Sequence, residues 1–306
     1  MKPGLVSLLF VAALAGCTTD NGLTAVKLDA IAVVNGDFDD ITPTLLRNEI
    51  GSAPFNGYIS QSTTFVGDPG DPAPKRDDPG HTVEELFTAP SGDQQHFEVD
   101  MYNAVFVNSG TRGLNAFQYN YTLDPDDALL TDELAMTNAC HFPKANGSLF
   151  VTDWSYDLVE ACWPDAIEFA NDDLTVDDAQ AGVVGEVLAD VTDPDLAETL
   201  GTSVVNVEFN YSAFAVMEDV GADVEVLLRG DVMVQPLDGG EPVVQKNAPL
   251  IVRIPGGTYG VGKNGQVVFS SFHFYPQTPV LTDALLFRGL QGLAAGDGDK
   301  STEAIQ

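Results

Sequence analysis

The chain has 306 residues and a formal net charge of −33, with 46 acidic and only 13 basic side chains. A surface of this sign repels phosphate groups, which argues against nucleic acid as a partner. With 44% hydrophobic residues the chain can bury a substantial core. After the N-terminal segment, no apolar run is long enough to span a bilayer.

The N-terminus has the pattern of a secretion signal: Met1-Lys2, an apolar run over 5–15, and small residues before Cys17. The ending Leu14-Ala15-Gly16-Cys17 resembles the lipobox of bacterial lipoproteins. That resemblance implies cleavage before Cys17 and lipid on its sulfur and new amino terminus. An ordinary signal peptide followed by an unrelated cysteine is the alternative.

This start predicts a protein of the bacterial cell envelope whose membrane partner is the lipid bilayer, reached through acylated Cys17. Thr18 stands where enteric lipoproteins retained at the inner membrane have aspartate, which favours an outer membrane if the host has one. We expect the following organisation: signal peptide 1–16, lipidated cysteine and tether 17–26, a single α/β domain 27–295, and a frayed tail 296–306.

The first half of the mature chain alternates apolar runs with helical segments. Buried strands that end in polar turns are predicted at 28–34, 102–107 and 147–152. Helices are predicted at 41–50, with Thr42 as N-cap, at 126–139, and after the segment 153–157 through Cys162. Residues 67–80 carry repeated Asp-Pro and Pro-Gly signals, which predict an exposed, acidic, Pro-rich loop. This alternation favours a mostly parallel central sheet with flanking helices.

The second half is richer in short β segments. They are predicted at 183–191, 204–209, 213–217, 224–228, 232–234, 250–254 and 266–269, and they include a β-rich insertion near 190–245. An amphipathic helix is predicted at 282–293, with Thr282 as its N-cap.

Two cysteines remain once Cys17 is lipidated. Cys140 and Cys162 would then lie in an oxidising compartment, where an even pair favours a disulfide. A nucleophilic cysteine is the alternative. It lacks support because Cys162 has no Gly-rich turn beside it, and the only histidine next to Cys140 is its chain neighbour His141.

The acidity itself has two interpretations. It provides solubility, for instance in a salty habitat where counter-ions screen self-repulsion. It could also provide oxygen ligands for a divalent cation such as calcium. The acidic clusters do not follow the spacing of an EF-hand loop. No cofactor is predicted, and calcium is kept as the alternative.

Three segments together, 32–39, 146–157 and 266–273, resemble the class I glutamine-amidotransferase-like fold and its relatives of the trehalose-utilisation type. The resemblance covers about 26–295, with a poor fit at 60–95 and 190–240, and implies a flavodoxin-like layout. In that family a nucleophilic cysteine occupies a sharp strand-to-helix turn, and a late strand supplies a histidine followed two residues later by a glutamate.

This chain departs from that pattern at two of the three positions. The turn carries Asp153-Trp154-Ser155 with no cysteine, His273 matches the family histidine, and Tyr275 replaces the glutamate. The family chemistry needs a thiolate beside an oriented base. Glutamine hydrolysis by that route is therefore excluded.

Ligands of open α/β sheets bind beyond the carboxyl ends of the strands. The residues predicted there are Asn35, Asp37, Asp39, Asn108, Ser109, Asp153, Trp154, Tyr156, Asp157 and His273. Asp37 or Asp153 together with His273 could perform acid–base work or hold a hard cation.

The same residues have structural explanations: aspartates cap helices and turns, aromatic rings pack against loops, and a histidine can be buried and hydrogen-bonded. Ser155 is a poor nucleophile candidate because it lacks the flanking glycines of a nucleophile elbow.

Three functions follow as hypotheses. The first is a non-catalytic envelope lipoprotein that binds a small ligand or an envelope partner. The second is an Asp/His-dependent hydrolase that a metal could assist. The third is a structural or adhesive surface protein, in which the acidic face and the Pro-rich loop meet other surface polymers.

Overall fold

The computed structural model describes residues 31–35, 41–48, 56–59, 83–91, 96–109, 132–170, 179–210, 213–236 and 239–294. The predicted signal peptide, Cys17 with its tether, the loop at 67–80 and the tail at 296–306 lie outside these residues. Among the helices within them, none has both the length and the apolar character needed to cross a membrane.

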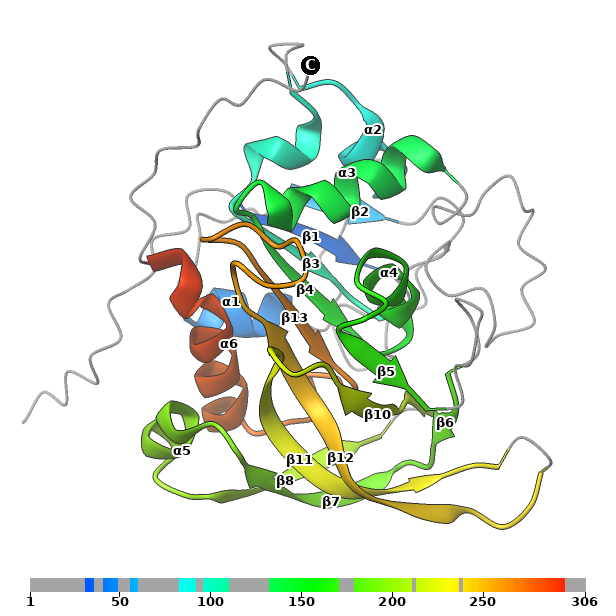
Figure 1. Ribbon diagram of the computed structural model, residues 1–306. Coiled ribbons are helices and arrows are strands. Elements are labelled where there is room, and N and C mark those ends of the chain that lie inside the picture. The colour runs from blue at the N-terminus through cyan, green and yellow to red at the C-terminus, as the bar shows by residue number, and fades with distance from the viewer. Residues whose placement is uncertain are drawn as a thin grey trace, which may run out of the picture.

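Five parallel strands form the centre of the large sheet (Figure 1). They are β1 (Ile31–Asn35), β2 (Asn56–Ile59), β3 (Ala104–Val107), β4 (Ser148–Thr152) and β13 (Gln266–Ser270). Their spatial order is β2-β1-β3-β4-β13, and all four pairings are parallel. Numbered along the chain this is 2-1-3-4-5, the flavodoxin-like order. The predicted fold class, a mostly parallel central sheet flanked by helices, is confirmed.

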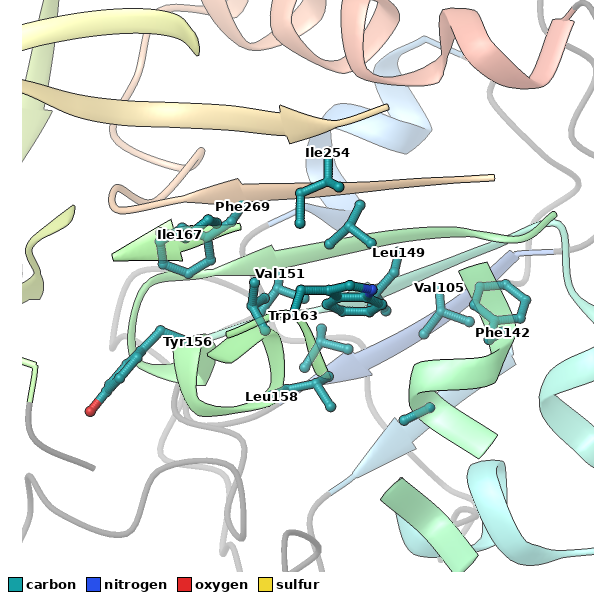
Figure 2. Close-up of a cluster of buried hydrophobic side chains, with 14 of the residues drawn as sticks. Val105, Phe142, Leu149, Val151, Tyr156, Leu158, Trp163, Ile167, Ile254 and Phe269 are labelled. Atoms are coloured by element: carbon teal, nitrogen blue, oxygen red, sulfur yellow. The ribbon is translucent and has the colours of Figure 1, made fainter. Parts of the chain in front are cut away.

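Helices cover both faces of this sheet, because alternate residues of each strand point to opposite sides. Val105 and Val107 of β3 pack in the core with α2 (Val83–Thr88), α3 (Glu133–Lys144) and α4 (Tyr156–Cys162), as Figure 2 shows for Val105, Phe142 and Leu158. Ala104 and Phe106 face the other core, with α1 (Thr42–Arg47) and α6 (Pro279–Ala294). Burying a large apolar side chain contributes about 1.5–3 kcal/mol, so these two cores stabilise the sheet from both sides.

An antiparallel extension continues the sheet beyond β13. It comprises β6 (Ala181–Gly182), β7 (Gly185–Val191), β8 (Val204–Phe209), β9 (Phe214–Ala215), β11 (Glu225–Val234) and β12 (Val243–Ile254). β12 pairs with β13 through residues 251–254, and β11, β7 and β8 follow in turn. The helix α5 (Pro194–Leu200) joins β7 to β8, and the β11–β12 hairpin projects away from the helices (Figure 1).

Three smaller elements complete the described fold. A separate two-stranded sheet pairs β5 (Ile167–Phe169) with β10 (Met217–Val220). The 3-10 turns η1 (Glu98–Met101) and η4 (Asp153–Ser155) precede β3 and α4, respectively.

The predicted disulfide is confirmed. Cys140 in α3 is bonded to Cys162 at the end of α4, with a Cα–Cα distance of 5.2 Å. It therefore joins two helices that cover the same face of the parallel sheet.

Several element boundaries differ from the predictions. The helix predicted at 126–139 spans Glu133–Lys144 and begins after Asp132, whose side chain accepts hydrogen bonds from the Leu134 and Ala135 amides. Thr42 is the first helical residue of α1 rather than its N-cap. Thr282 is not the N-cap of the last helix, because α6 already begins at Pro279.

Two predicted strands, 224–228 and 232–234, are one strand, β11. Gly230 lies inside it because a Cβ there would be 2.6 Å from Val187 on the neighbouring strand. The segment predicted at 213–217 divides instead into β9 and β10.

Candidate functional site

The chain turns sharply at Asp153, between β4 and α4. Asp153 directly follows the last residue of β4 and has φ +46°, a left-handed conformation that few residues other than glycine adopt. A strained strand-to-helix turn of this kind presents the nucleophile in α/β-hydrolases. In this chain the side chain at that turn is a carboxylate, and it is 0% exposed.

His273 comes from the neighbouring strand end. At the end of β13, the Ser270 hydroxyl donates to the Phe272 carbonyl and accepts from the Phe272 amide, which bends the chain there. The His273 Nε2 atom then lies 2.9 Å from Asp153 Oδ2, and His273 is 5% exposed. Two of the residues predicted from strand-end positions are thus in direct contact.

The antiparallel extension covers this pair. The amide of Ala215 in β9 donates to Asp153 Oδ1 at 2.9 Å, and the Trp154 indole donates to the Ala213 carbonyl at 3.2 Å. We call residues 213–215 the strap. Since Asp153 Oδ2 contacts His273, both carboxylate oxygens of Asp153 are engaged. Asp153 therefore holds the strap and His273, and α4 receives no side-chain cap.

Gln277 makes a second connection between the extension and the site. Its Nε2 donates to the His273 carbonyl and to the Glu208 carbonyl of β8, at 2.9 and 2.7 Å. Its Oε1 accepts from the Glu208 amide at 3.0 Å. The strap and Gln277 together fix the extension against the turns that carry Asp153 and His273.

The aromatic candidates lie under the extension. Trp154 and Tyr156 are buried, with ring centroids 6.0 Å apart in an edge-on arrangement. The Tyr156 hydroxyl accepts from the Ala179 amide at 3.1 Å. Both rings pack inside the protein, as the structural alternative in the sequence analysis proposed for Trp154 and Tyr156.

Asn108 and Ser109 tie the end of β3 to the same turn. Ser155 Oγ donates to the Asn108 carbonyl at 2.9 Å, and the Ser109 amide donates to Thr152 Oγ1 at 3.0 Å. A pocket on the α1 side of these strand ends is lined by Ile41, Phe106, Val107, Asn108, Phe150, Val151, Thr152, Val268, Ser270 and Phe274. Its volume is about 10 Å³, the space of about one water molecule.

The remaining predicted residues are placed as follows. Asp157, in the first turn of α4, is buried. The backbone of Asn35 ends β1, while its side chain and all of Asp37 and Asp39 lie outside the described residues. Within the described ranges, no group of three or more His, Cys, Asp or Glu side chains is arranged to hold a metal ion.

The structure adds two partners that the sequence analysis did not single out. The Ala215 amide belongs to the backbone and leaves no residue-type signal. Gln277 stands four residues after His273, but its role depends on β8, which is far away in the sequence. Neither contact could be found without the long-range pairing of the strands.

No protein-family model and no curated protein matches the sequence. Among solved structures, the chain is similar to a cytoplasmic protein of Salmonella typhimurium, with 14% identity, a TM-score of 0.43 and coverage of 86% of this chain and 98% of the other. It is also similar to a Bacteroides uniformis protein described as ThuA-like, with 9% identity, a TM-score of 0.44 and coverage of 87% and 92%.

A third similar structure is the glutaminase domain of Trypanosoma brucei CTPS with bound acivicin, with 11% identity, a TM-score of 0.39 and coverage of 90% and 98%. At these levels of identity and TM-score, the comparisons assign no activity, substrate or location to this chain. The fold class rests on the strand order itself.

Proposed function

We propose that this chain is a lipid-anchored protein of the bacterial cell envelope whose amidotransferase-like α/β domain is a non-catalytic binding module. One observation carries the non-catalytic part. Asp153 occupies the turn where a nucleophile would be presented, and its two carboxylate oxygens are bound by His273 and by the Ala215 amide in a fully buried position.

The chemistry of such sites supports this interpretation. A nucleophile or a general base must come within hydrogen-bonding reach of the substrate. Asp153 and His273 instead face each other beneath the strap, at 0% and 5% exposure. Buried ionisable groups are tolerated when they are paired and hydrogen-bonded, and removing one partner is strongly destabilising. The pair acts in this proposal as a structural joint between the parallel sheet and the extension.

A hydrolase panel tests the non-catalytic part. We expect the purified mature protein to hydrolyse amide, ester and glycoside reporter substrates no faster than buffer does. The His273→Gln variant, with folding checked by circular dichroism, should behave identically. Turnover that wild type shows and folded His273→Gln lacks would overturn the proposal.

Turnover that depends on His273 would favour the Asp/His-dependent hydrolase, for which the Asp153–His273 contact is the specific supporting observation. Activity would then require the strap to leave Asp153. Adding calcium or magnesium to the same panel tests metal assistance, and Asp153→Asn should abolish any metal-dependent rate.

Labelling tests the anchor. The Leu14-Ala15-Gly16-Cys17 motif supports acylation of Cys17. In a bacterial host with the lipoprotein pathway, we expect wild type to incorporate an alkyne-tagged palmitate and to partition with membranes. Cys17→Ser should lose both properties. Equal labelling of the two proteins would contradict acylation at Cys17.

A further inference from the structure

We propose that the solvent-facing side of the antiparallel extension docks a partner protein with a cationic, apolar-centred surface. This inference rests on the proposed function as a binding module and identifies the surface and the chemistry of its partner. We call this side the outer face, formed by Glu186, Leu188 and Asp190 of β7, Val204, Asn206 and Glu208 of β8, Asp231 and Met233 of β11, and Val244 and Lys246 of β12.

Strand alternation separates the outer face from the core. In β7, Ala189 and Val191 are buried, while Glu186, Leu188 and Asp190 are exposed. In β11, Val232 and Val234 are buried, and Asp231 and Met233 are exposed. No helix covers this side of the extension in Figure 1.

Three large apolar side chains form a strip across the outer face. Leu188 is 72% exposed, Met233 40% and Val244 48%. Met233 and Val244 are directly opposite each other in the β11–β12 pairing. Because Ala189 pairs with Gly230, Leu188 lies beside Asp231 and diagonal to Met233, a spacing that long side chains can bridge.

Carboxylates surround this strip. Glu186 lies directly opposite Glu208 in the β7–β8 pairing, and like charges in that arrangement destabilise a sheet. The basic groups available here are already used: Lys246 Nζ lies 2.5 Å from Asp231, and Arg229 donates to the Asn247 carbonyl. A cationic partner would supply the missing counter-charge.

At the outer edge of β8, side chains occupy the backbone groups of two residues that would otherwise pair with an added strand. The amide and carbonyl of Glu208 are bound by the Gln277 side chain. The amide and carbonyl of Val204 are bound by the Thr202 hydroxyl, at 3.2 and 3.0 Å. Side-chain blocking of this kind prevents edge-to-edge pairing, so a partner is directed to the face of the sheet.

Charge also selects the kind of partner. A second copy would bring Glu186 and Glu208 against their equivalents, on a chain whose net charge is −33. Anionic lipid headgroups would be repelled in the same way. A basic protein surface is attracted, and apolar side chains at its centre would cover Leu188, Met233 and Val244.

Two synthetic peptides test the inference on the mature protein: one alternates valine and lysine, and the other alternates valine and glutamate. We expect saturable binding of the lysine peptide in a calorimetric titration. Leu188→Ser should weaken that binding by about tenfold or more, because it removes the apolar side chain at the centre of the contact without changing the charge of the face. Val280→Ser is the matched control, since Val280 is 67% exposed on α6 and lies away from the outer face. It should leave binding unchanged.

Four results would overturn the inference: undiminished binding by Leu188→Ser, equal weakening by Val280→Ser, equal binding of the glutamate peptide, or a wild-type dimer in sedimentation that Leu188→Ser dissociates. The last result would assign the face to a second copy. If these experiments overturn docking at the outer face and no enzymatic activity is found, the proposed non-catalytic function still stands. Turnover that depends on His273 would instead overturn the proposed function, on which this inference rests.

Discussion

Asp153 has two features that each cost free energy, a positive φ and a buried carboxylate. Its positive φ is tolerated by aspartate, asparagine and glycine better than by other residues, and its buried carboxylate needs partners to offset the loss of hydration. The hydrogen bonds to the Ala215 amide and to His273 supply those partners. Aspartate is therefore suited to this turn, because it tolerates the positive φ and its carboxylate finds hydrogen-bond partners there.

Replacing Asp153 should consequently affect stability. We expect Asp153→Ala to lower the free energy of unfolding by about 2–4 kcal/mol, since it leaves the Ala215 amide and the His273 ring without this partner and adds backbone strain. Asp153→Asn should cost less, because its amide can serve both partners at the same φ. Urea unfolding measures both variants.

Asp223→Ala, at an exposed position, is the control and should change stability by less than about 0.5 kcal/mol. If Asp153→Ala were as mild as this control, the joint between the sheet and the extension would not exist.

Asp193 links stability to pH. Burial tends to raise the pKa of its carboxyl, but hydrogen bonds from Arg288 and the Leu196 amide outweigh that effect and hold the pKa below the ordinary 3.8. The pKa of Asp193 is lower in the folded state than in the unfolded state. Its charge therefore stabilises the fold fully at a pH above the unfolded-state pKa, and this stabilisation disappears as the pH falls through the folded-state pKa. Asp193→Asn should therefore be less stable than wild type at neutral pH.

The difference in the free energy of unfolding between wild type and Asp193→Asn should become smaller as the pH is lowered below about 4. Urea unfolding at a series of pH values from neutral to strongly acidic measures it. A difference that stayed constant with pH would show that the charge of Asp193 contributes nothing.

Residue-level prediction depended on position along the chain and on the family resemblance. Asp153 and His273 were singled out because each lies beyond a predicted strand, where neighbouring parallel strands bring side chains together, and because His273 matches the histidine of the resembled family. The structure places these two side chains in contact. The sequence could not predict that the strap covers them, because Ala215 carries no polar side chain. It also left open whether Trp154 and Tyr156 face a ligand, and the structure buries both rings.

At the level of elements, Gln277 blocks the outer edge of β8 at Glu208. Gln277→Leu removes hydrogen bonds to Glu208 and His273, and each lost bond costs about 0.5–1.5 kcal/mol. We expect faster amide hydrogen exchange over 204–209 in this variant and a tendency to self-associate in sedimentation, because the edge is uncovered.

Exchange in β13 of the same variant is the internal control and should stay as slow as in wild type. Equal acceleration of β8 and β13 would indicate general destabilisation instead of an opened edge.

The disulfide between α3 and α4 should contribute through the unfolded state. It closes a loop with a sequence separation of 22, for which loop-closure entropy gives about 3 kcal/mol. The Cys140→Ser, Cys162→Ser double variant should lose about that amount in urea unfolding. Dithiothreitol should lower the free energy of unfolding of wild type and leave that of the double variant unchanged. A double variant as stable as oxidised wild type would show that the bridge adds no stability.

Strands were easier to predict than the points where elements begin. Continuous apolar runs identified β3 and β4 because parallel strands are buried on both faces. Separate strands were predicted at 224–228 and 232–234, but β11 continues through Gly230, where the tight contact with Val187 requires a glycine. The helix α6 begins before Thr282 because Pro279 is well suited to the first helical position. These differences arise from packing across strands and from competing capping signals.

For the whole molecule, the dominant feature is the imbalance of charge. Within the described ranges, three arginines are bound to carboxylates, in the pairs Arg47–Asp283, Arg253–Glu225 and Arg288–Asp193, and Lys246 pairs with Asp231. The sequence has 46 acidic residues but only 13 basic ones, so there are too few basic side chains to pair with most of the carboxylates. Self-repulsion of this kind destabilises a compact state.

Salt should therefore stabilise this protein. Between about 0.01 M and about 1 M sodium chloride the Debye length falls from about 30 Å to about 3 Å, which screens repulsion between exposed carboxylates. The partly buried Arg288–Asp193 pair is screened much less, so the net effect favours the folded state. If screening returns about 2 kcal/mol, the Tm rises by roughly 4–8 °C. Thermal melts across the salt series measure this shift.

The same melts separate screening from a specific calcium site. Calcium and magnesium chloride at equal millimolar concentration have the same ionic strength, so screening predicts equal shifts. A markedly larger shift with calcium would indicate specific ligation by carboxylates, and saturation with calcium concentration would give its affinity. A Tm that fell with sodium chloride would show instead that the few ion pairs outweigh the repulsion among all other carboxylates, and the excess of acid would then need an explanation other than life in a salty medium.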